Sequence, residues 1–378
     1  MRLLHVTTYA PDLLQTHYER TPELAGAPYQ VQHERVLALL YSWSDFIVAR
    51  VRARGGAGAA IVANDTRAQQ QWAREHGAGG TSRDAILLKQ IAHERPDVLF
   101  FQDSYSFSPE LVREAKRLLP RGAIVSAYSG LASIPPRPPG MIGELDVLVV
   151  AGWPIADQFP TRARQTVVMG HGFEPAILDR VPDTGPRLAA SFIGQLGTTL
   201  HAERRELLET VARAVPLTLY SATLRATPKA ALRQFAAAVV RRRLNAHLAL
   251  MRSPLNRGVL PPVYGAEMYG VLRRSDISFN QQGGNVPFYV PNMRLFEVTG
   301  CGSCIVTDAR PGIEKLFAPD AEIVTYRSKD DLGEKVKWLA DHPRERAAIA
   351  VAGQRRTLRD HTFHSRVDEL LGEFQSRL

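Results

Sequence analysis

Cysteine is scarce in this chain of 378 residues, which contains only Cys301 and Cys304. Two cysteines cannot form the disulfide framework of a small secreted domain, so that class is excluded and a reducing compartment is expected. The sequence also lacks any run of ~18 apolar residues, the length that a membrane-spanning helix needs. We therefore expect a cytoplasmic protein, bound at most to the inner face of a membrane.

The N-terminal residues, MRLLHVTTYAPD, contain one arginine and a short apolar run that polar residues follow at once. This pattern predicts a strand rather than a secretory signal peptide. Lys and Arg number 47 against 38 Asp and Glu, which gives a formal net charge of +9. Such an excess favours an anionic partner, and nucleic acid, a membrane surface and a phosphorylated small molecule all fit it.

Basic residues are concentrated in two runs, 241–243 and 273–274. A solvated helix face is the plainest interpretation of both, and peripheral contact with a membrane is the second. Aromatic residues, on which nucleic-acid bases stack, are not interleaved with either run. No nucleic acid is therefore expected as a partner.

The chain is too long for one ordinary domain, and its 45% hydrophobic residues suffice for two cores. In both halves, apolar runs typical of buried strands alternate with stretches of helical periodicity. The expected strands are Leu3–Thr7, Ala59–Ala63, Asp97–Phe101, Ala123–Ala127, Asp146–Val150, Ala189–Ile193, Leu217–Tyr220, Ile277–Asn280 and Ser303–Thr307. The expected helices include Val31–Arg54, Arg67–His76, Arg83–Glu94, Ser108–Leu118, Ala202–Ala214, Met268–Arg274 and Pro291–Thr299.

This alternation predicts an α/β fold whose parallel sheets are covered by helices on both faces. Gly and Pro are frequent in residues 170–187, so the link between two domains is expected there. We predict two Rossmann-like domains that face a cleft, residues 1–175 and residues 176–361, followed by a C-terminal helix in residues 362–378.

The segment from Asn280 to Gly302, NQQGGNVPFYVPNMRLFEVTGCG, carries the clearest chemical pattern. A strand ends, a glycine-containing loop follows, and a helix opens near Asn292, which can cap it. Open α/β sheets bind ligands beyond the carboxyl ends of their strands, and a helix N-terminus attracts anions. This geometry suits a diphosphate, with Arg294 in reach of a phosphate and Glu297 placed to accept hydrogen bonds from a ribose. The alternative is a capped, solvent-facing helix of any α/β protein.

The C-terminal sequence resembles a known family. NMRLFEVTGCGSCIVTDARPGIEKLFAPDAEIVTYRS and the tail AGQRRTLRDHTFHSRV are similar to the C-terminal domain of the CgeB-type (spore-maturation protein) glycosyltransferases, in the GT-B superfamily. The similarity continues through PPVYGAEMYGVLRRSDISFN and SFIGQLGTTLHAERRELLE, and more loosely through YSWSDFIVARVRARG, WAREHG and RPDVLFFQD. It therefore covers nearly the whole chain.

The resemblance implies a GT-B fold and transfer of a sugar from a nucleoside-diphosphate sugar to a glycan, a lipid-linked sugar or a protein. The donor would bind residues 176–361 and the acceptor residues 1–175, and the helix of residues 362–378 would be able to pack back on the acceptor domain. In the relatives, the glutamate that corresponds to Glu297 binds the donor ribose.

The resemblance is incomplete at the donor sugar. Many retaining relatives have a second glutamate eight positions before the first, where this chain has Tyr289. The sugar identity and the choice between retention and inversion therefore stay open. The remaining candidates for the donor site are Gln281, Gly283, Gly284, Asn285 and Tyr264.

A second candidate donor loop, Gly194-Gln195, follows a strand and precedes His201, Arg204 and Arg205. In GT-B relatives this loop approaches the donor phosphates, with a basic residue nearby. Relatives often have Arg at the position of Gln195, so Arg204 or Arg205 would take its place, since a guanidinium binds phosphate through paired hydrogen bonds. The alternative is a helix start with solvated arginines.

Two further side chains are candidates for catalysis. Asp103 follows the apolar strand DVLFF, at the end where active-site residues collect, and inverting transfer needs a general base there. His171, in the expected domain link, is suited to proton transfer or to a hydrogen bond to the sugar. The alternatives are a helix cap for Asp103 and a structural role for His171.

The segment Cys301-Gly302-Ser303-Cys304 has redox-motif spacing, but it follows a helix and enters a strand, the reverse of a thioredoxin-type motif. We expect it to serve in packing. The sequence has no His/Cys cluster typical of zinc and no Asp-x-Asp pair, so no cofactor and no obligatory metal are expected.

The function that these patterns favour is glycosyl transfer from a nucleotide sugar. Two alternatives remain: a GT-B scaffold that binds nucleotide or sugar without catalysis, which Tyr289 would favour, and a basic nucleic-acid-binding protein.

Overall fold

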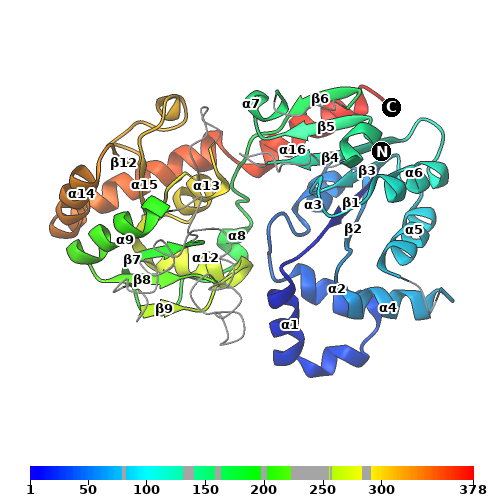
Figure 1. Cartoon of the computed structure of the whole chain (residues 1–378), viewed down its shortest axis with the longest axis horizontal. Coiled ribbons are helices and arrows are strands. Elements are labelled where there is room, and N and C mark those ends of the chain that lie inside the picture. Colours follow the sequence, from blue (N-terminus) through cyan, green and yellow to red (C-terminus); the bar gives the residue numbers. More distant parts are fainter. Residues whose placement is uncertain are drawn as a thin grey trace, which may run out of the picture. The chain divides into compact units, whose positions relative to one another are not determined.

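The computed structural model describes residues 1–78, 82–130, 140–157, 163–196, 202–222, 255, 258–282 and 291–378. The chain forms two compact units, Met1–Gly170 with Phe363–Leu378 and His171–Thr362, and each is built on one sheet (Figure 1). The last residues of the chain therefore belong to the first unit.

In the described part of the first unit, six strands pair in the order β2-β1-β3-β4-β5-β6, and every pair is parallel. The strands are β1 (Arg2–Thr7), β2 (Ala57–Val62), β3 (Val98–Phe101), β4 (Ile124–Ser129), β5 (Val147–Val150) and β6 (Gln165–Val168). Runs such as VLFF in β3 are wholly buried, as expected for a parallel sheet covered on both faces. The strand order reverses between β1 and β3, the point at which such sheets bind ligands.

The helices of the first unit are α1 (Pro11–Arg20), α2 (Tyr29–Leu37), α3 (Phe46–Ala53), α4 (Thr66–Glu75), α5 (Arg83–Glu94), α6 (Pro109–Leu118), α7 (Trp153–Ala156) and α16 (Phe363–Gln375). Two 3₁₀ turns, η1 (Pro22–Gly26) and η2 (Gly140–Glu144), accompany them. Helix α16 packs against α3, where Phe363 contacts Trp43 and Phe46 and Asp368 pairs with Arg50.

The expectation of one helix over Val31–Arg54 is wrong, because α2 ends and α3 begins within this range. Three residues between the two helices have positive φ: Leu40, Ser42 and Ser44. This backbone conformation is rare outside glycine and cannot continue a helix. The Ser44 hydroxyl donates to the Leu37 carbonyl at 2.6 Å and closes the turn, so the apolar spacing reflects burial of two helices and a turn.

The second unit repeats the plan. Six strands of its described residues pair in parallel in the order β12-β11-β10-β7-β8-β9. They are β7 (Leu188–Ile193), β8 (Leu217–Tyr220), β9 (Val259–Leu260), β10 (Ser275–Phe279), β11 (Cys304–Asp308) and β12 (Val324–Tyr326). The order reverses between β7 and β10, which places the topological switch point at the ends of these two strands.

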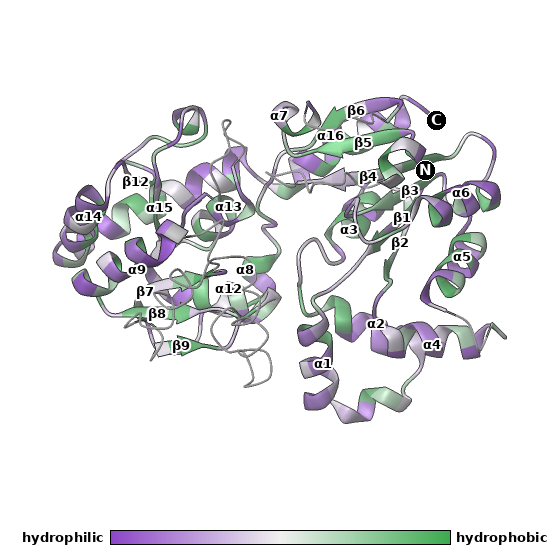
Figure 2. Cartoon of the chain, viewed as in Figure 1, coloured by the Kyte–Doolittle hydropathy of each residue, from purple (hydrophilic) through white to green (hydrophobic). Residues whose placement is uncertain are grey.

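The helices of the second unit are α8 (Ile177–Arg180), α9 (Ala202–Ala214), α12 (Gly265–Arg274), α13 (Met293–Gly300), α14 (Lys329–Asp341) and α15 (Pro343–Asp360), with the 3₁₀ turn η4 (Ile313–Lys315). In Figure 2 the strands of both sheets carry mostly hydrophobic residues, while α14 and α15 also carry hydrophilic ones. Such amphipathic helices bury one side against the sheet.

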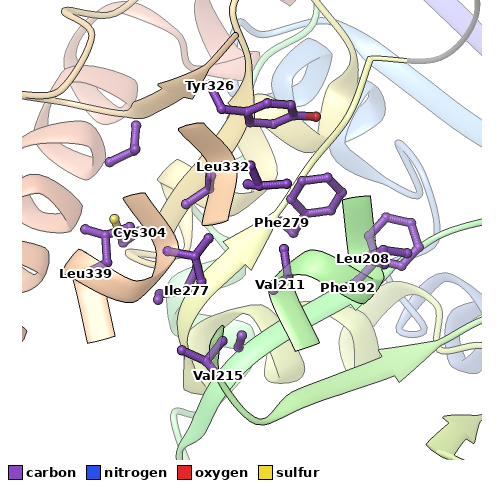
Figure 3. Close-up of a cluster of buried hydrophobic side chains, with 14 of the residues drawn as sticks. Phe192, Leu208, Val211, Val215, Ile277, Phe279, Cys304, Tyr326, Leu332 and Leu339 are labelled. Atoms are coloured by element: carbon purple, nitrogen blue, oxygen red, sulfur yellow. The ribbon is translucent and has the colours of Figure 1, made fainter. Parts of the chain in front are cut away.

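An apolar core joins the second sheet to α9, α14 and α15 (Figure 3). Its side chains include Phe192, Leu208, Val211, Ile277, Phe279, Tyr326, Leu332 and Leu339. Alternate strand residues point to the other face. Buried hydroxyls link β7, β10 and the start of β11 through Ser191, Ser278 and Ser303, and small side chains of this kind let helices approach a sheet closely. The predicted fold class, two Rossmann-like α/β domains with parallel sheets, is confirmed.

Candidate functional site

The N-terminus of α13 is capped as the sequence predicts. The Asn292 side chain accepts a hydrogen bond from the Leu295 amide at 3.2 Å. Asn292 also exchanges two amide hydrogen bonds with Asn280, at 3.0 and 3.3 Å. Its own backbone amide donates to the Gln282 side chain at 3.2 Å. These hydrogen bonds hold the end of β10 against the first turn of α13.

Four residues of the predicted donor loop lie outside the described residues: Gly283, Gly284, Asn285 and Tyr289.

Glu297 lies one turn into α13 and is 7% exposed. Its Oε2 is 2.9 Å from Nη1 of Arg294, and its Oε1 accepts from the hydroxyl of Tyr269 on α12 at 3.4 Å. Burial, and then the negative charge of Glu297, raise the pKa of Tyr269 well above its usual value, so this hydroxyl remains a donor. Two groups thus orient the carboxylate that we expect to bind a ribose.

Arg204, on α9, connects the two strands at the switch point. Its Nη1 donates to the Gln195 carbonyl at 2.9 Å, just after β7. Its Nη2 and Nε donate to the Gln281 carbonyl and side-chain oxygen at 2.9 and 3.2 Å, just after β10. The guanidinium lies over the Phe192 ring, 5.5 Å from its centroid. Burial lowers the pKa of Arg204 to about 10.

The other residues in and after the second candidate donor loop, Gly194-Gln195, have different surroundings. The backbone of Gly194 donates to the Tyr220 carbonyl at 3.1 Å, and a Cβ at this position would lie 2.8 Å from the Phe192 ring. Arg205 lies 3.8 Å from Glu209 in an ion pair along α9. His201 is outside the described residues.

A pocket of about 500 Å³ lies at the carboxyl ends of β10, β11 and β12, beside the first turn of α9. Gln281, Asp308, Arg310 and Tyr326 line it together with Glu203. Asp308 accepts from the Gln282 amide at 2.8 Å and pairs with Arg310 at 2.6 Å. Sequence reasoning missed Asp308, although it ends a buried strand, the signal that selected Asp103.

Tyr264, the last predicted donor residue, occupies the N-cap position of α12 in an extended conformation. Its carbonyl accepts from the Met268 amide at 3.2 Å. Tyr264 thus stands at the start of the helix whose Tyr269 contacts Glu297.

In the first unit, Asp103 lies beyond the end of β3, at that sheet's switch point. Its Oδ2 accepts from the Thr8 hydroxyl, which follows β1, at 3.4 Å. Its Oδ1 accepts from the backbone amides of Tyr105 and Ser106 at 2.8 and 2.6 Å. Hydrogen bonds from backbone amides two and three residues further on are typical of a side chain that caps a turn. Oδ1 of Asp103 therefore already has a structural role.

His171 is the first residue of the second unit. Burial lowers its pKa to about 4, so the imidazole is neutral at physiological pH. A neutral imidazole is the form that accepts a proton or a hydrogen bond. Its catalytic role, like that of Asp103, stays a prediction.

The described residues hold no group of three or more His, Cys, Asp or Glu side chains that could bind a metal ion. No helix among them is long and apolar enough to cross a membrane. Cys301 caps the end of α13 and Cys304 begins β11; both are buried free thiols.

Comparisons with known proteins agree with this architecture. The model of a family described as glycosyl transferase-like matches residues 204–372, from α9 into α16. No curated protein matches the chain significantly.

Solved structures similar to the chain share its fold at low identity. An α-glucosyltransferase in complex with UDP-glucose and DNA containing an abasic site is 13% identical with a TM-score of 0.61, and the match covers 99% of each chain. HepE from Anabaena in complex with UDP-glucose is 13% identical, with a TM-score of 0.58 and 100% of both chains covered. Sucrose-phosphate synthase from Thermosynechococcus elongatus is 10% identical, with a TM-score of 0.57, and covers 100% of this chain and 99% of its own.

The fold is therefore that of GT-B glycosyltransferases. Together with this fold, the match to the glycosyl transferase-like family model supports the conclusion that the protein is a glycosyltransferase. The narrower resemblance to the CgeB-type family rests on the sequence motifs and stays a prediction.

Proposed function

We propose that this protein transfers a sugar from a nucleoside-diphosphate sugar to a glycan, a lipid-linked sugar or a protein, and that the second unit binds the donor. The observation that carries the proposal is the Glu297 carboxylate, oriented by Arg294 and Tyr269 next to the capped start of α13. The glycosyl transferase-like match includes this helix, and similar structures were solved with UDP-glucose or UDP.

Donor recognition would use three features of the second unit. Glu297 accepts hydrogen bonds from the ribose hydroxyls. The start of α13 offers backbone amides and a positive dipole to the diphosphate. Arg294 or Arg205 supplies positive charge as the diphosphate departs, which stabilises the developing charge in the transition state.

The first unit would hold the acceptor. Asp103 follows a strand at the switch point of that sheet, and its Oδ2 would accept the proton of an acceptor hydroxyl in an inverting transfer. His171, neutral at physiological pH, would bind a sugar hydroxyl or accept a proton. Magnesium dependence is not expected, because the sequence has no Asp-x-Asp pair to hold the ion on a diphosphate.

The test is thermal unfolding in the presence of UDP, GDP and ADP and of their sugar conjugates. A ligand that binds the native state raises the melting temperature by mass action. We expect one nucleotide series to stabilise the protein, and the matching nucleotide sugar to be hydrolysed slowly in the absence of acceptor.

The alternatives give different results in the same assay. Stabilisation without hydrolysis or transfer would indicate a binding scaffold that lacks catalysis. No stabilisation by any nucleotide, together with salt-dependent binding of long DNA or RNA, would overturn the proposal in favour of nucleic-acid binding.

A further inference from the structure

Arg204 is almost fully enclosed, with 7% of its surface exposed. A guanidinium has five N–H donors, and three hydrogen bonds of Arg204 go to protein oxygens on two different loops. Its face lies against the Phe192 ring. These contacts use three of the five donors, and they hold the side chain in place without a ligand.

The two loops that Arg204 joins are those at the switch point of the second sheet. Gln195 follows β7 and Gln281 follows β10, and these strands pair directly. The next residue, Gln282, accepts from the amide of Asn292, and the preceding residue, Asn280, bonds the Asn292 side chain. The backbone of residues 280–282 thus connects the hydrogen bonds of Arg204 with those of the cap of α13, the helix that carries Glu297.

We propose that Arg204 is a positioning residue, which fixes the loops after β7 and β10 and the start of α13 for the nucleotide without contacting its phosphates. This inference rests on the proposed function, and it changes the role that the sequence suggested for Arg204. Lysine would not replace this arginine, because one ammonium cannot reach oxygens of two loops in the geometry of a planar fork.

The first experiment needs no nucleotide. Hydrogen–deuterium exchange is measured on the wild type, on Arg204→Lys and on a control, Arg213→Lys, which alters an arginine near the other end of α9 that contacts Thr210. We expect faster exchange in peptides 188–196 and 275–282 of the Arg204 variant alone. Exchange equal to that of the wild type would overturn the inference, since the loops would then not depend on Arg204.

The second experiment compares uridine and UDP binding by calorimetry. If Arg204 binds a phosphate, Arg204→Lys should weaken the binding of UDP and leave that of uridine, which has no phosphate, unchanged. If Arg204 positions the site, the variant should bind both ligands at least about tenfold more weakly, by the same factor, because the whole site is displaced. Unchanged affinity for both ligands, or a loss confined to UDP, would contradict the inference.

Gln281→Ala supplies an independent variant in case Arg204→Lys folds poorly. It removes the acceptor of Arg204 Nε and leaves the arginine in place. The inference predicts weaker binding of uridine and UDP, whereas a phosphate-binding Arg204 freed from Gln281 would bind UDP as well or better, which would overturn it. A wild type that binds neither uridine nor UDP would instead show that the donor carries another nucleotide, and the exchange data would then decide alone whether Arg204 holds the loops.

Discussion

Arg294 and Glu297 form an ion pair across one turn of α13, with 2.9 Å between Nη1 and Oε2. The sequence predicts a different ligand for each residue: a phosphate for Arg294 and a ribose for Glu297. The ion pair links the two roles, because a diphosphate that attracts Arg294 would release one carboxylate oxygen of Glu297. Tyr269 would still hold the other oxygen, so the carboxylate would remain oriented while gaining capacity to accept from a ribose.

Glu297→Ala should weaken nucleotide binding by about 1.5–3 kcal/mol, the usual contribution of hydrogen bonds to a charged group. The measurement is calorimetric titration with the nucleotide that stabilises the wild type. A 2′-deoxynucleotide serves as the matched control: it should bind the wild type more weakly than the ribonucleotide but bind the variant equally well. A folded variant with unchanged affinity would show that Glu297 does not contact the nucleotide.

Changing Cys301 and Cys304 to alanine should leave turnover within a few-fold. Burial raises the pKa of both thiols, that of Cys304 to about 12, so neither forms the thiolate that redox or nucleophilic chemistry requires. Activity is measured with and without reductant, and the unfolding midpoint of each variant reports the packing loss. Activity lost at full stability, or a strong response to reductant, would contradict a packing role.

Much of the second unit could be predicted from local sequence. The cap at Asn292 and the limits of α9 and β8 follow from residues next to one another in the chain. The two-residue strand β9 was not predicted, since Val259–Leu260 is too short to show any periodicity. The turn within Val31–Arg54 was also missed, because the spacing of buried residues there matches that of a continuous helix.

The candidate site was predictable as a set of residues and less so as a set of contacts. The end of β10 and the start of α13 could be predicted as the candidate donor region, because strand ends and helix starts are visible in sequence. The contacts of Arg204 were not visible, since its partner Gln281 lies 77 positions away. Tyr269, 28 positions from Glu297, was missed for the same reason.

Acid should destabilise the protein in part through His5, a fully buried residue of β1, which has a neighbouring strand on each side. Burial lowers the pKa of His5 from 6.5 to about 4. The unfolded chain therefore binds a proton that the folded chain does not between these values. The contribution of His5 to stability is fully present above about pH 6.5, falls as the pH drops towards 4 and stops changing below it, for a loss of about 3 kcal/mol.

The free energy of unfolding of the wild type and of His5→Gln should be compared by denaturant titration across this pH range. The variant should be less stable at pH 8 but lose less stability on acidification. Burial also lowers the pKa of His33 to about 4, so the variant should keep part of the acid sensitivity. Identical pH profiles for both proteins would show that His5 does not titrate in the unfolding transition.

Gly300, the last residue of α13, should not tolerate a side chain. A Cβ there would lie 2.2 Å from the Phe173 ring, which is fully buried, so Gly300→Ala should cost about 1–3 kcal/mol of stability through overpacking. Gly270→Ala on α12 is the matched control. Its Cβ would meet Val181 at 3.9 Å, an ordinary contact, and alanine should be neutral or stabilise the helix by up to about 1 kcal/mol.

A smaller side chain at position 173 should relieve the overpacking. Phe173→Leu replaces the ring that occupies the space, so the double variant with Gly300→Ala should be more stable than the sum of the two single changes predicts. The strain would also displace the helix that carries Glu297, so Gly300→Ala should weaken nucleotide binding and Phe173→Leu should restore part of it. Additive stabilities and an unchanged nucleotide affinity would mean that α13 is not held in place by the contact between Gly300 and Phe173.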